Sequence, residues 1–208
     1  MKDNYDHHLM WNISNNVNVF SPDSKPYGLT YGDWSVKWWQ WIESIPKDHS
    51  PLSDSTGKDC AVNQTGPVWF LAGTSGGSAE RSCTIPAGKA IFFPITNDMA
   101  SFAKYPNLKT ESELISNVKS DIDQVKSLEL TVDGTKIEGL DKYRVQSHVF
   151  DVAIAENNLF EIKAGSTKAA SDGYWIFLEP LPKGEHTIHF HGIEHDFETE
   201  VNYRLTVQ

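Results

Sequence analysis

Three histidines near the end of the chain have the spacing of a metal site. His189 and His191 are two residues apart in an alternating segment, so on a strand both imidazoles point to one face. His195 follows in the next expected turn, and His148 opens another expected strand. Imidazole nitrogens suit Cu or Zn. The hypothesis is a metal site at His189, His191 and His195; the alternative is a solvated strand face.

A second candidate is the oxygen-rich loop formed by residues 54–59. The carboxylates of Asp54 and Asp59 flank a turn at Gly57, and such oxygens can hold Ca²⁺. The segment lacks the full spacing of a calcium-binding hand and its terminal glutamate. Calcium binding by Asp54 and Asp59 is therefore weighed against an ordinary polar turn.

Catalytic signatures are weak in the rest of the chain. The glycine-rich segment 73–78 resembles a phosphate-binding loop only in composition, because the residues after it predict a strand. Carboxylates that could act as general acids or bases, such as Asp98, Asp151 and Glu179, are scattered singly. Glycosidase chemistry needs two at a set distance. The sequence thus leaves enzymatic activity open and favours a binding role.

Cys60 and Cys83 are the two cysteines of the chain. They flank an apolar segment and a Gly/Ser loop, so a strand that leaves and one that returns would bring them together. A disulfide indicates an oxidising compartment, and glycosylation sequons at Asn12 and Asn63 agree with it. The first six residues lack the apolar core of a signal peptide. We expect an extracellular or cell-surface protein whose leader lies outside this sequence.

Four of the seven tryptophans fall in one short segment, which predicts an amphipathic helix over residues 31–45. Thr30 and Asp33 form a capping box, and Pro46 ends the pattern. The apolar stripe contains Trp34, Trp38, Trp41, Ile42 and Ile45, and Trp39 lies on its flank. The polar side is expected to hold Lys37, Gln40, Glu43 and Ser44. The stripe predicts a helix anchored on a sheet; a sugar-stacking platform is the alternative.

The rest of the chain predicts mostly short strands. Asp133 and Gly134 are typical of a two-residue hairpin turn, and residues 174–178 read as a central strand. A second capping box at residues 110–113 begins another helix. We therefore expect an antiparallel β-sandwich or jelly roll with two inserted or flanking helices. It would be a single domain over residues 30–208, preceded by an extended arm over residues 1–29.

Composition excludes several classes of protein. The formal net charge of −10 argues against nucleic acid and against anionic lipid surfaces. A hydrophobic content of 39% excludes global disorder. No apolar run of about 18 residues is present, so no membrane insertion through a helix is expected.

The arm is the expected contact with a partner. Val17, Val19 and Phe20 alternate with polar residues and could add a strand to a neighbouring sheet edge. The expected partner is another copy of the chain or an extracellular or cell-surface protein.

Four sequence segments carry a resemblance. They are residues 66–73 (GPVWFLAG), 81–89 (RSCTIPAGK) and 92–97 (FFPITN), together with residues 38–41 (WWQW). The chain resembles, over about a third of its length, a group of uncharacterised, exported microbial proteins. This resemblance implies a secreted single domain with paired cysteines and carries no known activity.

Three functions are therefore held open. The first is an extracellular binding or assembly module, self-associating through its arm or its sheet edges. The second is a histidine-ligated Cu or Zn protein or enzyme. The third is a carbohydrate-binding module, with Trp175 or Trp11 more suitable for stacking on sugars than the helix residues, among which only Trp39 keeps a chance of reaching a ligand.

Overall fold

The computed structural model describes residues 17–208, which fold into two five-stranded sheets and two α-helices. Sheet A has the order β1-β3-β8-β6, with β7 also pairing with β8. Its strands are β1 (Val68–Phe70), β3 (Ala90–Ser101), β6 (Arg144–Gln146), β7 (Phe150–Ile154) and β8 (Gly165–Leu178). Sheet B has the order β2-β10-β9-β4-β5. Its strands are β2 (Gly77–Ile85), β4 (Val125–Val132), β5 (Thr135–Lys136), β9 (Gly184–Glu194) and β10 (Phe197–Val207).

The predicted β-sandwich with two helices is confirmed, but the sheets are mixed instead of purely antiparallel. β1 pairs with β3 in parallel, and β10 pairs with β2 in parallel; the other pairs are antiparallel. A jelly-roll strand order is not confirmed. Parallel pairing was not foreseen because it joins strands that are distant in the sequence and leaves no local turn signal.

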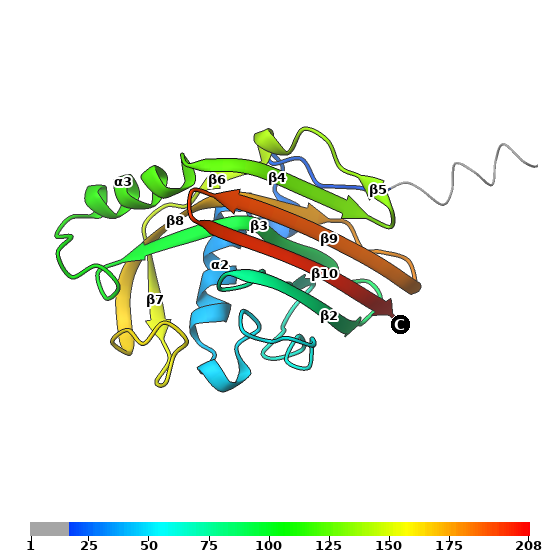
Figure 1. The fold of residues 1–208 in the computed structure, drawn as a ribbon, viewed down its shortest axis with the longest axis horizontal. Helices are drawn as coiled ribbons and strands as arrows, with labels where there is room; N and C mark the ends of the chain where they lie inside the picture. The colour runs from blue at the N-terminus through cyan, green and yellow to red at the C-terminus, as the bar shows by residue number, and fades with distance from the viewer. Residues whose placement is uncertain (1–16) are drawn as a thin grey trace, which may run out of the picture.

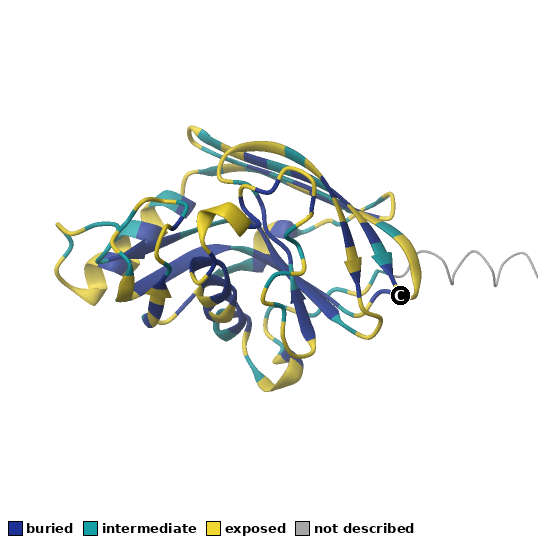
Figure 2. Cartoon of the chain, turned by 90° about the horizontal axis from the view of Figure 1, so that it is seen from below, coloured by how far each residue is buried: buried dark blue, intermediate teal, exposed yellow. Residues whose placement is uncertain are grey.

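The helix α2 (Tyr31–Glu43) covers the face of sheet A that points away from sheet B (Figure 1). Trp38 packs on Trp175 of β8, while Phe93 of β3 stacks on Phe190 of β9 on the other side. Sheet A is therefore the middle layer of three. Figure 2 shows its strands buried over much of their length, whereas sheet B alternates between buried and exposed residues. The predicted central strand 174–178 lies in β8.

The capping box of α2 is confirmed, since Thr30 Oγ1 accepts from Asp33 N–H and Asp33 accepts from Thr30 N–H, both at 3.1 Å. All four tryptophans of the helix are buried. Their indole N–H groups each donate to one acceptor at 2.9 Å, and these acceptors are Pro26 O, Leu71 O, Ser171 Oγ and Val62 O. The helix is thus an anchor with satisfied polar atoms, as its pattern predicted.

The helix α3 (Glu111–Ile122) packs over β3 and β8 through Leu114 and Val118. Its cap at Thr110 is confirmed. The helix ends before Val125, which instead begins β4. The Asp133-Gly134 hairpin joins β4 to β5, with both residues at positive φ.

Short 3-10 turns complete the fold at Pro26–Gly28, Lys47–His49 and Leu140–Tyr143. The predicted disulfide joins Cys60 to Cys83, with 6.0 Å between Cα atoms, and so ties the loop after α2 to β2. Among the described helices, none is long and apolar enough to span a membrane.

Candidate ligand-binding cavity

A cavity of about 320 Å³ lies along β3 where its pairing with β1 ends. β1 pairs with residues 90–92 only, and the chain then leaves β3 at Gly73–Ser75. A register shift between Pro94 and Thr96 bends β3 at the same place. Proline has no N–H to offer a neighbouring strand, so it fits an open edge. An unpaired strand edge, a bulge and a departing loop together leave the space.

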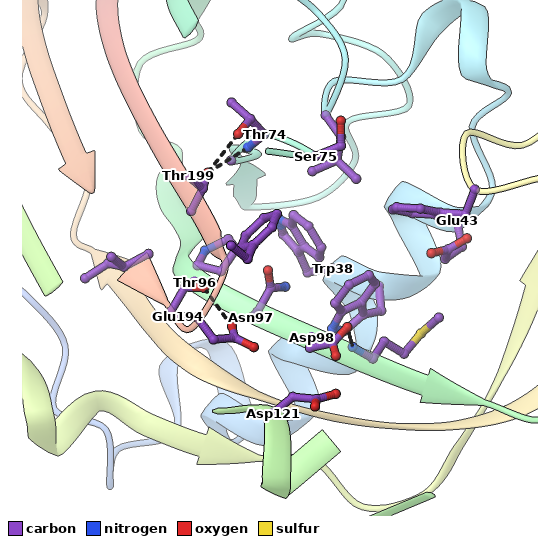
Figure 3. A pocket seen from close by; sticks show the side chains of 18 of the residues that line it. Trp38, Glu43, Thr74, Ser75, Thr96, Asn97, Asp98, Asp121, Glu194 and Thr199 are labelled. Atoms are coloured by element: carbon purple, nitrogen blue, oxygen red, sulfur yellow. Dashed lines mark hydrogen bonds between the residues drawn. The ribbon is translucent and has the colours of Figure 1, made fainter. Parts of the chain in front are cut away.

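The cavity wall comes from every layer of the fold. It is lined by α2, β3, the loop after β1, the loop after β7, one residue of α3 and the β9–β10 hairpin. Figure 3 shows the polar side chains arriving from these different elements around one space. The site therefore exists only in the folded chain, because its lining residues extend from Trp38 to Thr199.

Four carboxyl groups and one ammonium line the cavity. The carboxyl groups belong to Glu43 of α2, Asp98 of β3, Asp121 of α3 and Glu194 of β9. Lys104 Nζ lies 3.2 Å from Asp98 Oδ1 and is the one cationic side chain in the lining. One positive charge therefore faces four acidic groups, and the cavity is short of positive charge.

Burial and the neighbouring charges shift the pKa values of three of these groups. Burial raises the pKa of Glu194 to about 7, with the charges of Asp98 and Asp121 adding to the effect. Burial also raises the pKa of Asp121 to about 6, and a hydrogen bond shared with Asp98 contributes. Burial alone would lower the pKa of Lys104, but the charge of Asp98 outweighs it and the pKa is raised. Lys104 therefore stays protonated while part of the acidic cluster holds protons near neutral pH.

Glu43 is the most isolated of the four. The residue is only 3% exposed, and its carboxylate has no hydrogen bond or ion pair within residues 17–208. Burial raises its pKa to about 7, and Lys104 offsets only part of that rise. Its main-chain carbonyl accepts from Ala155 N–H at 2.9 Å, which fixes the end of α2. The Glu43 side chain lines the cavity, so a ligand bound there could contact its carboxylate.

The remaining wall is largely apolar and aromatic. Trp38, Trp39, Phe160 and Phe197 contribute rings, with further apolar surface from Leu52, Pro94, Ile95, Met99 and Ile162. The side-chain amide nitrogen of Asn97 is buried without a hydrogen-bond partner among the described residues. The site thus combines apolar surface, acidic groups and unused hydrogen-bonding capacity.

The predicted histidines lie on the outer face of sheet B, away from this cavity. His189 and His191 do share a face, and their Nε2 atoms contact Glu200 Oε1 at 2.8 Å and Glu198 Oε1 at 2.6 Å. His195 sits in the following turn with its side chain 60% exposed and contacts Asp196 at 2.9 Å. The structure brings the first two histidines beside carboxylates, whereas His195 does not join the same ligand group.

Asp54 stabilises the loop in which it lies. Its carboxylate is buried and accepts from the N–H groups of Thr56, Gly57 and Asp59 at 2.9–3.0 Å. Asp59 Oδ1 instead contacts His49 Nδ1 at 3.3 Å. These contacts give Asp54 a structural role, and calcium binding by Asp54 and Asp59 stays a prediction.

The other predicted sites are placed as follows. Asn63 is exposed in a turn, and Asn12 lies outside the described residues. Trp175 is 0% exposed, so it cannot stack on a sugar, and that suggestion was wrong. Trp11 also lies outside the described residues. Trp39 does line the cavity, as its flanking position on the helix suggested.

Val17, Val19 and Phe20 lie against their own domain. Val19 forms a bridge with Leu178, and Phe20 N–H donates to Phe177 O at 2.9 Å. All three pack partly buried against the core. A role of these residues in binding a partner stays a prediction.

Sequence reasoning singled out Asp98 but missed Glu43, Asp121 and Glu194. Glu43 was expected on the solvated side of the tryptophan helix, and the structure buries it. One local signal pointed to it: Glu43 follows Trp39 by four residues and so shares its face of the helix. Asp121 and Glu194 offered no such signal, because α3 and β9 meet only in the fold.

Comparison with known proteins adds no activity to this picture. No protein-family model matches the chain, and neither curated proteins nor solved structures give a match. The function must therefore be argued from the cavity itself.

Proposed function

We propose that the protein binds a small organic cation, an amine that also carries an apolar or aromatic portion, in the cavity beside β3. The observation that carries this proposal is Glu43, a carboxylate that is 3% exposed, faces the cavity and has no partner among the described residues. An unpaired carboxylate in a cavity favours a ligand with a positive charge.

Charge and shape support the same ligand class. An ammonium group would supply the positive charge that Lys104 alone does not provide to four carboxyl groups. The aromatic rings of Trp39, Phe160 and Phe197 offer apolar surface and faces that attract cations. A volume of about 320 Å³ falls at the lower end of the range for small-molecule sites.

The arrangement of the acidic groups favours an organic cation over a metal ion at this position. Within residues 17–208, the one set of three histidine or acidic side chains whose ligand atoms converge within 4.8 Å lies elsewhere. The carboxyl groups of the cavity instead surround a space. A metal ion needs ligands that converge on a point at about 2.0–2.6 Å, whereas an amine can contact carboxylates on different sides.

Calorimetric titration with matched ligand pairs tests this proposal. Arylalkylamines are compared with the neutral alcohols and the carboxylic acids of the same carbon skeleton. The amines are expected to bind, the alcohols more weakly, and the acids not at all. In the Glu43→Gln variant, amine affinity is expected to fall at least about tenfold, because a charged hydrogen bond contributes about 1.5–3 kcal/mol.

Glu156→Gln is the matched control, since Glu156 is an exposed carboxylate that does not line the cavity. It should leave amine binding unchanged. Equal affinity for amines and alcohols, or unchanged amine binding in Glu43→Gln, would rule the proposal out.

General acid–base catalysis is a second candidate function, favoured by the pairing of Asp121 with Asp98. Asp121 has a pKa raised to about 6, mainly by burial, next to a carboxylate that Lys104 contacts at 3.2 Å. Two adjacent carboxyl groups, one of them with a raised pKa, can donate and accept protons on a bound substrate. Screening chromogenic glycosides and esters with the native protein and Asp121→Asn tests this; turnover that the variant retains argues against it.

The proposed location is extracellular. Its support is the Cys60–Cys83 disulfide, because such bonds persist in oxidising compartments. Self-association through the arm also remains a proposal, distinct from ligand binding, and is tested below by truncation.

A further inference from the structure

A second cluster of polar side chains lies on the outer face of sheet B, where β4, β9 and β10 run side by side. Ile188 and Phe190 of β9 are buried toward sheet A, so the alternating His189 and His191 face outward. The register places His191 directly opposite Glu200 of β10. On its other side, His191 is opposite Glu129 of β4.

The side chains converge around His191. Its Nε2 lies 2.6 Å from Glu198 Oε1, and its Nδ1 lies 3.9 Å from Glu129 Oε2. His191, Glu198 and Glu200 each offer a ligand atom, and these three atoms lie within 4.8 Å of one another. His189 Nε2 lies 2.8 Å from Glu200 Oε1 and extends the group to a second imidazole.

Ordinary surface ion pairs are the alternative explanation of this cluster. Such pairs need cations, and in the described part of the chain no Lys or Arg forms an ion pair with Glu129, Glu198 or Glu200. Within residues 17–208 their partners are the imidazoles of His189 and His191 alone. Three carboxylates thus share two imidazoles, and no Lys or Arg of the described chain compensates them.

We propose that His191, Glu198 and Glu200 bind a divalent transition-metal ion, Zn²⁺ or Cu²⁺, with His189 as the fourth ligand. Imidazole nitrogens together with carboxylate oxygens are the donor set these ions accept. Neighbouring ligand atoms of a tetrahedral site lie about 3.3 Å apart, given metal–ligand bonds of about 2.0 Å. The ligand atoms of His191, Glu198 and Glu200 already lie within 4.8 Å of one another, so the shifts needed to reach that spacing are small.

An ion at this site would also affect the β9–β10 hairpin, which forms part of the cavity wall. Thr199 lies between Glu198 and Glu200 on β10, and it lines the cavity on the inner side of the sheet. Its Oγ1 accepts from Thr74 N–H at 3.0 Å, which attaches the loop of the cavity wall. An ion bound across β9 and β10 would hold the hairpin that forms this wall.

Titration of tag-free, chelator-treated protein with ZnCl₂ and with CuCl₂, followed by calorimetry, tests the proposal. One ion per chain is expected, together with a higher Tm in the presence of the metal, because a ligand that binds only the folded state stabilises it. His191→Ala and Glu198→Gln should each weaken binding at least about tenfold, since even partners of metal ligands contribute 10–100-fold to affinity. Glu198 is exposed and its replacement is isosteric, so this variant keeps the fold.

Two controls locate the ion. His148→Ala removes an exposed imidazole outside the cluster, and Glu43→Gln removes a carboxylate of the cavity. Both should bind the metal as the native protein does. The proposal is overturned if neither metal binds with a Kd below about 100 µM, if Glu198→Gln keeps native affinity, or if Glu43→Gln is the variant that weakens binding.

Discussion

At the scale of single residues, the cost of burying a charge identifies the groups with a role beyond folding. Arg81 and Glu43 are both 3% exposed, but their surroundings differ. The Arg81 guanidinium donates to Asp54 O, Ala72 O, Gly73 O and Tyr203 Oη at 2.6–2.9 Å. Glu43 has no comparable partner in the described chain. The role of Arg81 is therefore structural, whereas the proposed ligand would account for Glu43.

Replacement of Glu43 by Gln is expected to stabilise the protein at high pH. The folded-state pKa of about 7 exceeds the ordinary glutamate pKa of 4.5, so the folded state holds this proton more tightly than the unfolded state. Stability therefore falls as pH rises from about 4.5 through 7, and Gln avoids that loss. Urea unfolding should show Glu43→Gln more stable than native by about 1–3 kcal/mol at pH 8 and nearly equal at pH 4.

Glu156→Gln is again the control, and it should leave stability unchanged at both pH values. A Glu43→Gln variant that is less stable at pH 8 would mean that Glu43 has a structural partner. Gain of stability with loss of ligand binding is the pattern expected of a functional residue.

At the scale of elements, the cavity depends on how the loops around β3 are attached. The segment between α2 and β1 is held by the disulfide, by Trp41 donating to Val62 O, and by the contact of Gly57 with β2. A Cβ on Gly57 would lie 2.0 Å from Ser82 O, and its φ is +93°, so only glycine fits. This packing places the loop next to Gly73–Ser75. The main-chain carbonyl of Gly73 accepts a hydrogen bond from Arg81, which fixes its position.

Loss of the disulfide is expected to destabilise the domain without removing its fold. The Cys60→Ser, Cys83→Ser double variant should lose about 3 kcal/mol, the value for a closed loop of this length in the chain-entropy model. Thermal unfolding of the oxidised, reduced and double-variant proteins measures it. If the reduced native protein is as stable as the oxidised protein, the bond contributes nothing to stability and its support for an oxidising compartment weakens.

At the scale of the whole molecule, the local parts of the fold were predictable and the site was not. Thr30 with Asp33, Asp133 with Gly134 and the tryptophan stripe are patterns within a few residues, and each was confirmed. Glu43 and Glu194 are distant in the sequence and line the same cavity only because α2 and the β9–β10 hairpin both reach it in the folded chain. Parallel pairing of β10 with β2 was missed for the same reason.

The pH dependence of ligand binding follows from the whole cavity. Because Glu43, Asp121 and Glu194 have pKa values raised to about 7, 6 and 7, an amine must displace protons from them at low pH. Amine affinity is therefore expected to rise as pH increases from about 5.5 to 8, by about tenfold or more. Calorimetry across this range measures it, and affinity that is flat or falls with pH contradicts the proposed ligand class.

Two truncations distinguish the contribution of residues 17–25 from that of residues 1–16. Deleting residues 1–25 removes the bridge of Val19 with Leu178, the Phe20–Phe177 contact with ring centroids 5.2 Å apart, and the acceptor of Tyr31 Oη. Deleting residues 1–16 leaves all these contacts in place. The longer deletion should destabilise the domain by about 3 kcal/mol, comparable to the loss of a buried phenylalanine. The shorter deletion retains the contacts of Val19 and Phe20 and should change stability little.

Urea unfolding measures the stability of both truncated proteins, and light scattering measures their oligomeric state. If the arm joins copies of the chain through Val17, Val19 and Phe20, the longer deletion alters the oligomeric state. If both deletions keep the native oligomeric state, assembly through the arm is excluded and residues 17–25 act within their own domain.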